Sequence, residues 1–160
     1  MPSKKVSNTD NQQERLEIKY WIVGFVDGEG SFLVSIFRNK TTKSGWQVFP
    51  EFVVTQGAKS LKALELIRNF FGCGSIFINR RSDNHHEDLY RFCVRSLSDL
   101  DQKVIPFFER YKLRTAKKDD FEKFKAVVKL MRRGVHLKTD GFKKIQKISL
   151  TMNRKGIKRF

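Results

Sequence analysis

Two carboxylates, Asp27 and Glu29, follow an apolar segment of the chain and are separated by a single glycine. The segment Tyr20–Val26 is apolar on every face of a helix, which predicts a helix that is buried on more than one side. Negative charges at the C-terminal end of a helix are disfavoured by the helix dipole. In a chain of net charge +16, such a pair needs a compensating cation, and oxygen ligands suit a divalent metal ion. The spacing therefore predicts a metal site at the end of a buried helix.

The net charge indicates what such a site would act on. The chain has 33 lysines and arginines against 17 acidic residues, and the basic residues are spread over its whole length. A folded domain this positive favours a polyanion, and nucleic acid is the first expectation, ahead of a membrane surface or an acidic protein. No apolar run approaches the roughly 20 residues of a membrane span, so we expect no membrane-spanning segment.

The chain has two cysteines, Cys73 and Cys93, which form no CxxC pair. They fit an intracellular protein with free thiols, and both an organelle and a prokaryotic cytoplasm remain open. A zinc site that combines them with His85 and His86 lacks the usual ligand spacing and is disfavoured.

The domain organisation follows from composition. The polar residues 1–12 predict a flexible tail, residues 13–155 a single domain, and residues 156–160 a basic tail. The helices are expected at 12–27, 60–71, from Ser98 with a disturbance at Pro106, at 116–133 and at 139–153, with Ser60 and Thr139 as caps.

The strands must place the carboxylates against this helical framework. They are expected at 31–38, 47–56, 75–79 and 89–95 from apolar residues that alternate along the chain. In the first strand Phe32, Val34 and Ile36 face the core, and Pro50 predicts an irregularity in the second strand. This α-β-β-α-β-β-α order with further C-terminal helices predicts an α+β fold with an antiparallel sheet and helices on one face.

The segment Ile22–Gly30 resembles the nine-residue motif that names the LAGLIDADG family of homing endonucleases. The single-motif subunits of this family have this length and this order of elements, and the segments His136–Phe142 through Met152–Arg154 resemble their C-terminal end. The resemblance covers about residues 14–155. Within the motif, Gly24, Asp27 and Gly30 match, Ile22, Phe25 and Val26 are conservative replacements, Gly28 replaces another small residue, and Glu29 stands where aspartate is usual.

The resemblance implies a homodimer, because a single motif per chain requires two chains for one active enzyme. In this family the motif helix packs against its partner across a two-fold axis. The residues that this implies in or near the contact are Trp21, Gly24, Phe25 and Gly28.

The resemblance also implies roles in metal-dependent DNA cleavage. Glu29 from each chain would meet near the axis and bind Mg²⁺, with the backbone carbonyl of Gly28 as a second ligand, and the metal would activate water and stabilise the leaving oxygen. Gln56 matches a glutamine that helps to position the hydrolytic water. Lys117 lies in a Lys-x-x-Asp-Phe segment similar to that of the family's active-site lysine, and its neighbour Lys118 remains an alternative.

Two neighbouring positions depart from simple roles. Asp27 is expected to brace the helix end rather than to bind the metal. The segment Gly57–Ser60 departs from the family's pattern, and whether Lys59 replaces an arginine of some relatives stays open.

The strands are expected to supply the DNA surface. Arginine, glutamine and asparagine can pair in a two-pronged way with base edges in the major groove, whereas lysines in turns contact phosphates. The residues expected at DNA are Ser35, Phe37, Arg38, Asn39, Lys40, Lys43, Gln47, Glu51, Thr55, Ser75, Phe77, Asn79, Arg80, Arg81, Arg91 and Arg95.

The function predicted is a site-specific double-stranded DNA homing endonuclease. Strands of about nine residues span roughly 30 Å, so two subunits would cover roughly 18–22 bp of an imperfect palindrome. The resemblance implies cleavage across the minor groove with short 3′ overhangs. Two alternatives remain: an intron RNA maturase on the same scaffold, and a basic structural protein that would leave the carboxylate pair without a role.

Overall fold

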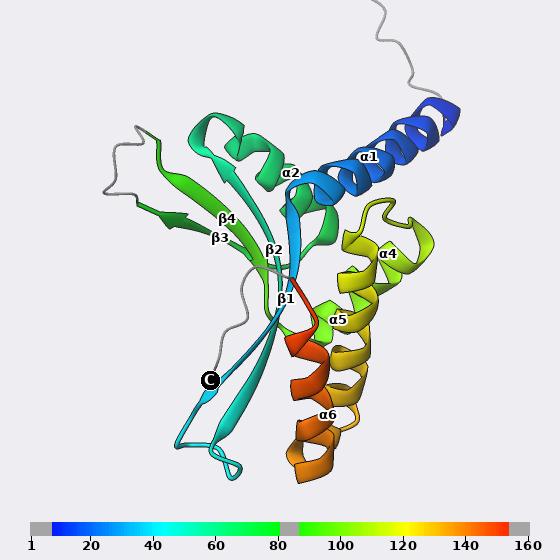
Figure 1. Ribbon diagram of the computed structural model, residues 1–160. Helices are drawn as coiled ribbons and strands as arrows, with labels where there is room; N and C mark the ends of the chain where they lie inside the picture. The colour runs from blue at the N-terminus through cyan, green and yellow to red at the C-terminus, as the bar shows by residue number, and fades with distance from the viewer. Residues whose placement is uncertain (1–7, 81–86, 154–160) are drawn as a thin grey trace, which may run out of the picture.

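The computed structural model describes residues 8–80 and 87–153. Its four strands form one antiparallel sheet in the order β1-β2-β4-β3, and the helices lie on one side of it (Figure 1). This confirms the expected α+β fold. The elements are α1 (Asn8–Glu29), β1 (Gly30–Arg38), β2 (Trp46–Gly57), η1 (Ala58–Ser60), α2 (Leu61–Phe71), β3 (Ser75–Asn79), β4 (Leu89–Val94), α3 (Leu97–Asp99), the π-helical η2 (Leu100–Val104), α4 (Ile105–Arg110), α5 (Lys117–Arg132), η3 (Val135–Leu137) and α6 (Thr139–Leu150).

Phe32 lies at the centre of the core, on the side of β1 that faces the helices. Its ring contacts those of Phe52 on β2, Phe108 on α4, and Phe121 and Phe124 on α5, at centroid distances between 5.1 and 5.4 Å. The two strands are in register at this point, with Phe32 opposite Phe52. The cluster therefore fixes the strand that begins where α1 ends.

The outer part of the first hairpin is less deeply buried than the alternation predicts. Val34 and Ile36 do face the helices, but both are only half-buried. They pack against a second, smaller cluster that includes Val127 of α5 and Ile145 of α6. The hairpin extends past the main core at this point, so two helices rather than the whole layer cover it.

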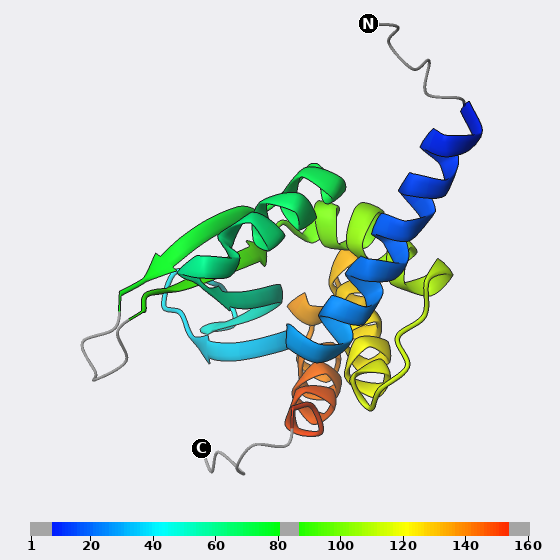
Figure 2. The same ribbon diagram turned by 90° about the horizontal axis from the view of Figure 1, so that it is seen from above.

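Helix α1 is longer than expected and leaves the body of the molecule. It begins at Asn8 rather than at residue 12, so residues 8–12 are helical instead of part of a flexible tail. Asp10 in the first turn is favoured by the helix dipole, and the glutamines and glutamates that follow are good helix formers. Figure 2 shows the N-terminal half of α1 projecting beyond the other helices, while Ile22 and Val26 of its C-terminal half are fully buried in the core.

Prolines affect the two elements that contain them differently. The pairing of β1 with β2 is continuous through Pro50, so the predicted irregularity is wrong. Pairing with β4 begins only at Phe52, which leaves one edge of β2 open at Pro50 and makes its missing N–H tolerable. Pro106 does disturb its helix as expected: a π-helical segment precedes α4, because proline cannot donate the usual bond to the preceding turn.

Some predicted helix caps are also wrong. Neither Ser60 nor Thr139 caps a helix through its side chain, and Thr139 is instead the first residue of α6. The cap that does form is at Ser96, whose hydroxyl accepts a hydrogen bond from the backbone N–H of Asp99. No helix in the described residues is long and apolar enough to cross a membrane.

Candidate functional site at the end of helix α1

Helix α1 passes into strand β1 without an intervening loop. Glu29 is the last residue of the helix and Gly30 is the first residue of the strand. A Cβ atom at position 30 would lie 2.6 Å from Cγ1 and 2.9 Å from the carbonyl oxygen of Val26, so only glycine allows this turn. Glu29 is exposed to solvent, and its backbone is fixed from both sides by regular structure.

Asp27 braces the helix end, as the sequence predicts. Its carboxylate accepts hydrogen bonds from the backbone N–H of Arg114 at 2.6 Å, the backbone N–H of Thr115 at 3.2 Å and the hydroxyl of Thr115 at 2.8 Å. Burial alone would raise the pKa of Asp27, but these hydrogen bonds and the charge of Lys117 outweigh it and lower the pKa. The carboxylate is therefore engaged in holding the segment before α5.

Lys117 lies against the same helix end. Its ammonium donates hydrogen bonds to the carbonyl oxygens of Val26 at 2.8 Å and Asp27 at 3.0 Å, which belong to the last turn, where backbone acceptors lack partners within the helix. Burial lowers the pKa of the ammonium, and the charges of Asp27 and Glu29 oppose this only in part. An ammonium has three donors, so one remains for a ligand.

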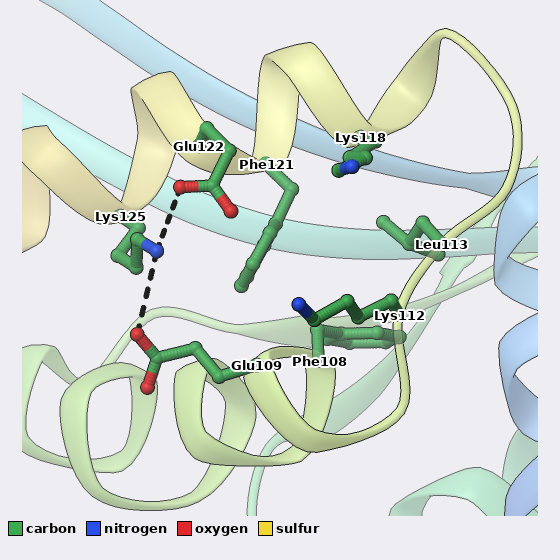
Figure 3. Close-up of a pocket in the computed structure, with 8 residues that line it drawn as sticks. All are labelled: Phe108, Glu109, Lys112, Leu113, Lys118, Phe121, Glu122 and Lys125. Atoms are coloured by element: carbon green, nitrogen blue, oxygen red, sulfur yellow. Dashed lines mark ion pairs between the residues drawn. The ribbon is translucent and has the colours of Figure 1, made fainter.

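Lys118, the alternative to Lys117, points elsewhere. It lines a cavity of about 210 Å³ between α4 and α5 (Figure 3). In this cavity Lys125 forms ion pairs with Glu109 at 3.3 Å and Glu122 at 2.7 Å. The geometry therefore brings Lys117, and not Lys118, to the end of α1.

Gln56 lies beside the turn from α1 into β1. Val54 of β2 pairs with Gly30, and Gln56 is two residues further along the same strand. Because side chains alternate along a strand, Gln56 shares the helix side of the sheet with Phe52 and Val54. It is half-buried there. Glu29, Gln56 and Lys117 thus come from three elements to one end of α1.

The donor atoms at this end suit a hard divalent cation. One chain offers the exposed carboxylate of Glu29 and the main-chain carbonyl of Gly28, both of them oxygen ligands. The described residues contain no group of three or more histidine, cysteine or acidic side chains that could hold a metal ion by themselves.

One face of α1 next to this end is covered only in part by the other described residues, through an edge contact between the rings of Tyr20 and Tyr111. Tyr20 is 64% and Trp21 41% exposed, and Trp21 stacks on Phe25 at a centroid distance of 4.9 Å. A Cβ added at Gly24 or Gly28 would meet no atom within 4 Å. The expected burial of α1 on more than one side is thus present only on the side that faces the core.

The residues expected at DNA lie mostly on the strands and in the first hairpin turn. We call the side of the sheet opposite the helices the open face. It carries Glu51 and Thr55 of β2, Phe77 of β3, Arg91 of β4, and Arg95, which directly follows β4. Exposed among the expected residues are Ser35, Phe37, Arg38, Lys40, Lys43, Ser75, Phe77, Asn79, Arg80 and Arg95, and half-buried are Asn39, Gln47, Thr55 and Arg91. Arg81 lies outside the described residues, as do His85 and His86.

Glu51 was expected on the exposed surface, and this is wrong. It is only 6% exposed, because its carboxylate is covered by two arginines, Arg91 and Arg95. A buried carboxylate needs such partners to offset the loss of hydration.

Three further expected DNA contacts have partners within the first hairpin. The guanidinium of Arg38 lies 4.4 Å from the ring centroid of Trp46, so it packs at the hairpin. The side chain of Asn39 donates to that of Gln47 at 2.7 Å and accepts from the backbone N–H of Thr41 at 3.0 Å, which shapes the turn.

Sequence reasoning did not find two supports of the site. Arg114 and Thr115 hold Asp27 through their backbone N–H groups, besides the hydroxyl of Thr115, and no side-chain pattern reveals such backbone donors. Asn153 donates from its side chain to the carbonyl of Phe32 at 2.7 Å and has a left-handed backbone, with φ of 47°. Asparagine tolerates that conformation better than most residues, and this was the one available signal.

Comparisons with known proteins agree with this geometry. Residues 22–128 match the model of a family described as LAGLIDADG endonuclease. The chain is 36% identical over 151 residues to probable intron-encoded endonuclease 3 of Neurospora crassa, which covers 94% of this chain and 27% of that protein. It is 31% identical over 136 residues to DNA endonuclease I-CeuI of Chlamydomonas moewusii, covering 83% of this chain and 61% of that protein. The chain thus spans little more than a quarter of the length of this Neurospora protein, and it covers 28% of probable intron-encoded endonuclease 2 from the same organism.

Solved structures give the same result. The homing endonuclease I-TnaI superposes with a TM-score of 0.80 at 42% identity, covering 88% of this chain and 91% of that chain. I-SmaMI bound to an uncleaved DNA target in the presence of calcium ions superposes with a TM-score of 0.78 at 35% identity, covering 88% of this chain and 46% of that chain.

The brace at Asp27 gives a prediction for stability. Since the pKa of Asp27 is lower in the folded chain than its usual value of 3.8, its charge stabilises the fold above that value, and this stabilisation is lost as the pH falls through the lowered pKa. We expect Asp27→Asn to reduce the free energy of unfolding at neutral pH by about 1–2 kcal/mol, and the difference from wild type to shrink below about pH 4. Urea unfolding at a series of pH values measures both.

The matched control is Asp119→Asn, in the exposed first turn of α5. It removes only a dipole interaction worth about 0.5 kcal/mol. Equal losses in the two variants would show that Asp27 is not a brace.

Proposed function

Because the chain belongs to the LAGLIDADG endonuclease family, we propose that it is a site-specific, Mg²⁺-dependent homing endonuclease that acts on double-stranded DNA as a homodimer. The observation that carries this proposal is the placement of Glu29, exposed, at the junction of α1 and β1, with Gln56 and Lys117 beside it. The net charge of +16 supports a polyanionic substrate. The descriptions of several relatives as intron-encoded support the same origin for this chain.

The exposed face of α1 and the small number of acidic ligands at the helix end support the proposed homodimer. Two copies of α1 packed through Trp21, Gly24, Phe25 and Gly28 would bring two Glu29 carboxylates together, and glycines permit a close approach of helix backbones. I-SmaMI has a chain roughly twice as long as this one, since 88% of this chain covers 46% of it. That ratio supports two copies of this chain in the active enzyme.

Each residue of the site has a separate task in the proposed reaction. Glu29 and the Gly28 carbonyl would hold the metal, which when bound lowers the pKa of a water and stabilises the leaving oxygen. Gln56, an uncharged donor and acceptor, would orient the attacking water. Lys117 would use its remaining donor on a phosphate oxygen or water, while Asp27 keeps the helix end in place.

The open face would supply the contacts to a long site. We propose that two sheets together cover roughly 18–22 bp of an imperfect palindrome, with cleavage across the minor groove at the centre, between the two copies of Glu29. The exposed lysines of the hairpin turn, Lys40 and Lys43, would contact phosphates, and the polar side chains of the strands would contact base edges.

The first prediction from the proposed function concerns the metal ligand. We expect a plasmid that contains the target, selected from a library of candidate sites, to be cut at one long site in Mg²⁺ and not in EDTA. Glu29→Gln should reduce the cleavage rate by at least about a hundredfold because it removes a ligand charge, while DNA affinity survives. The matched control is Glu17→Gln, an exposed glutamate further up the same helix, which should cut like wild type. Tight binding without cleavage under any metal would withdraw the nuclease proposal.

The second prediction separates the two adjacent lysines. Lys117→Met should lower the single-turnover cleavage rate by about 10²–10³-fold, which is typical for loss of a charge-stabilising donor. Lys118→Met should leave the rate within about threefold, because its side chain lies in the cavity between α4 and α5. Thermal unfolding and DNA affinity of both variants exclude a loss of fold. The opposite order of rates would place the active lysine at position 118.

The third prediction concerns assembly. The free protein should sediment at twice its chain mass of 18.8 kDa. Gly24→Leu should sediment as a folded monomer, because the position is open in the isolated chain but would be crowded in a close helix pair. Lys144→Leu, an exposed change on α6, serves as the control and should remain dimeric. A wild-type monomer at micromolar concentration without DNA would contradict the proposed interface.

A further inference from the structure

Glu51 is the one charged or polar residue that is buried among residues 9–80 and 87–153. It lies on the open face of the sheet and not in the core. Its Oε1 accepts a hydrogen bond from Nη2 of Arg91 at 2.8 Å, and its Oε2 accepts one from Nε of Arg95 at 2.7 Å. One carboxylate therefore holds two arginines in place on the surface that faces away from the helices.

The strand register explains how the two arginines converge. Arg91 pairs with Thr55, further along β2 than Glu51, whereas Arg95 directly follows the last residue of β4, which pairs with Phe52. The guanidinium groups thus approach Glu51 from two directions. Both guanidinium groups therefore reach the same carboxylate on the open face.

Arg95 is fixed by aromatic rings as well. Its guanidinium lies 4.8 Å from the ring centroid of Phe77 and 5.7 Å from that of Phe49. With the bond to Glu51, three side chains restrain its position. Such restraint removes in advance part of the conformational entropy that a long side chain loses on binding.

Net stabilisation of the fold is a weak explanation for the charge of Glu51. Replacing a whole buried ion pair by apolar residues of similar size is often neutral or stabilising. The next pair of residues on the same face, Val53 and Cys93, is apolar and buried. The carboxylate at position 51 and the two arginines around it therefore call for a different explanation.

The contacts leave both arginines with free donors. A guanidinium has five N–H groups, and Glu51 uses only Nη2 of Arg91 and only Nε of Arg95. Both Nη groups of Arg95 remain, and the arginine side chains are 36% and 41% exposed. A guanine presents two acceptors in the major groove, O6 and N7, which can accept hydrogen bonds from two parallel N–H groups of one guanidinium.

We propose that Glu51 is a positioning residue that orients Arg91 and Arg95 to recognise guanine in each half of the DNA site. This inference rests on the proposed function. Glu51 also leaves the three side chains with a net charge of +1 rather than +2, which weakens their attraction to phosphates of any sequence. It therefore increases discrimination in two ways, by fixing the arginines and by reducing unspecific affinity.

The test compares base preferences of wild type and Glu51→Gln. The amide keeps the shape of the side chain but has one acceptor oxygen in place of two, so in the wild-type geometry it can accept from only one of the two arginines. Binding is measured to a panel of DNA duplexes in which each base pair of the half-site is replaced in turn. We expect the preference for guanine to fall about tenfold at one or two positions of each half-site and to stay within about threefold elsewhere. Affinity for unrelated DNA should be unchanged or higher.

Two further variants keep the test decisive. Asp101→Asn is the matched control, since Asp101 also accepts from two cations, Lys129 at 2.7 Å and Arg132 at 3.2 Å, but lies on the helix side. It should alter no base preference. Arg95→Lys retains the charge and loses the two-pronged geometry, so it should reduce the same guanine preference as Glu51→Gln even where that variant is poorly folded.

A measurement without DNA distinguishes this inference from the proposed function. The Nε–H resonance of Arg95 should exchange more slowly with water in wild type than in Glu51→Gln, because a neutral amide accepts a weaker hydrogen bond than a carboxylate. A uniform loss of affinity at all positions, parallel to a loss of thermal stability, would reduce Glu51 to a structural role and overturn the inference. Failure of the wild type to bind any duplex, with the resonance still protected, would instead refute the proposed function.

Discussion

The last turn of α1 brings negative charge to a place where the backbone is already negatively polarised, and the rest of the structure is arranged around this conflict. The carbonyls of Val26 and Asp27 and the carboxylates of Asp27 and Glu29 lie within one turn of helix. Lys117 donates hydrogen bonds to these two carbonyls, and the backbone N–H groups of Arg114 and Thr115 donate to the carboxylate of Asp27. The carboxylate of Glu29 is left exposed to solvent. The partners of Val26 and Asp27 thus leave this carboxylate and the Gly28 carbonyl as the acceptors that the proposed function uses.

These bonds also join parts of the chain that are distant in sequence. Asp27 and Lys117 connect α1 to α5 across 90 positions, and Phe32, three residues after Glu29, packs against Phe121 and Phe124 of that same helix. Because β1 begins at Gly30 without a loop, any shift of α5 would move Glu29 with it. The core therefore serves the site directly, by fixing both elements that meet at Glu29.

The sequence predicted the helices and strands whose apolar residues recur at regular spacing. It did not predict features that depend on contacts with a distant part of the chain. Alternation located the strands to within a residue or two and assigned Phe32 and Ser31 to opposite faces of the first strand. The motif pattern identified Glu29. Alternation predicts the face of a side chain but not its neighbours across the sheet, so it places Glu51 on the exposed face without the two arginines, Arg91 and Arg95, that bury it. The sequence also could not decide whether Lys117 or Lys118 lies at the end of α1. The two lysines are adjacent and of the same type, and they differ only in the side of α5 from which they project. Backbone donors such as those of Arg114 and Thr115 leave no mark in a sequence at all.

The partly uncovered face of α1 and the exposed carboxylate of Glu29 lie at the same end of the helix. A Cβ atom at Gly24 or Gly28 would have no neighbour within 4 Å, and Glu29 follows directly. Under the proposed function, burial of the apolar face and assembly of the metal ligands are then a single event. The apolar surface of Trp21 and Phe25 supplies the favourable free energy, which offsets the repulsion between two approaching carboxylates until a metal binds. A chain that assembled without the metal would keep that repulsion, so metal binding and association should strengthen each other by linkage.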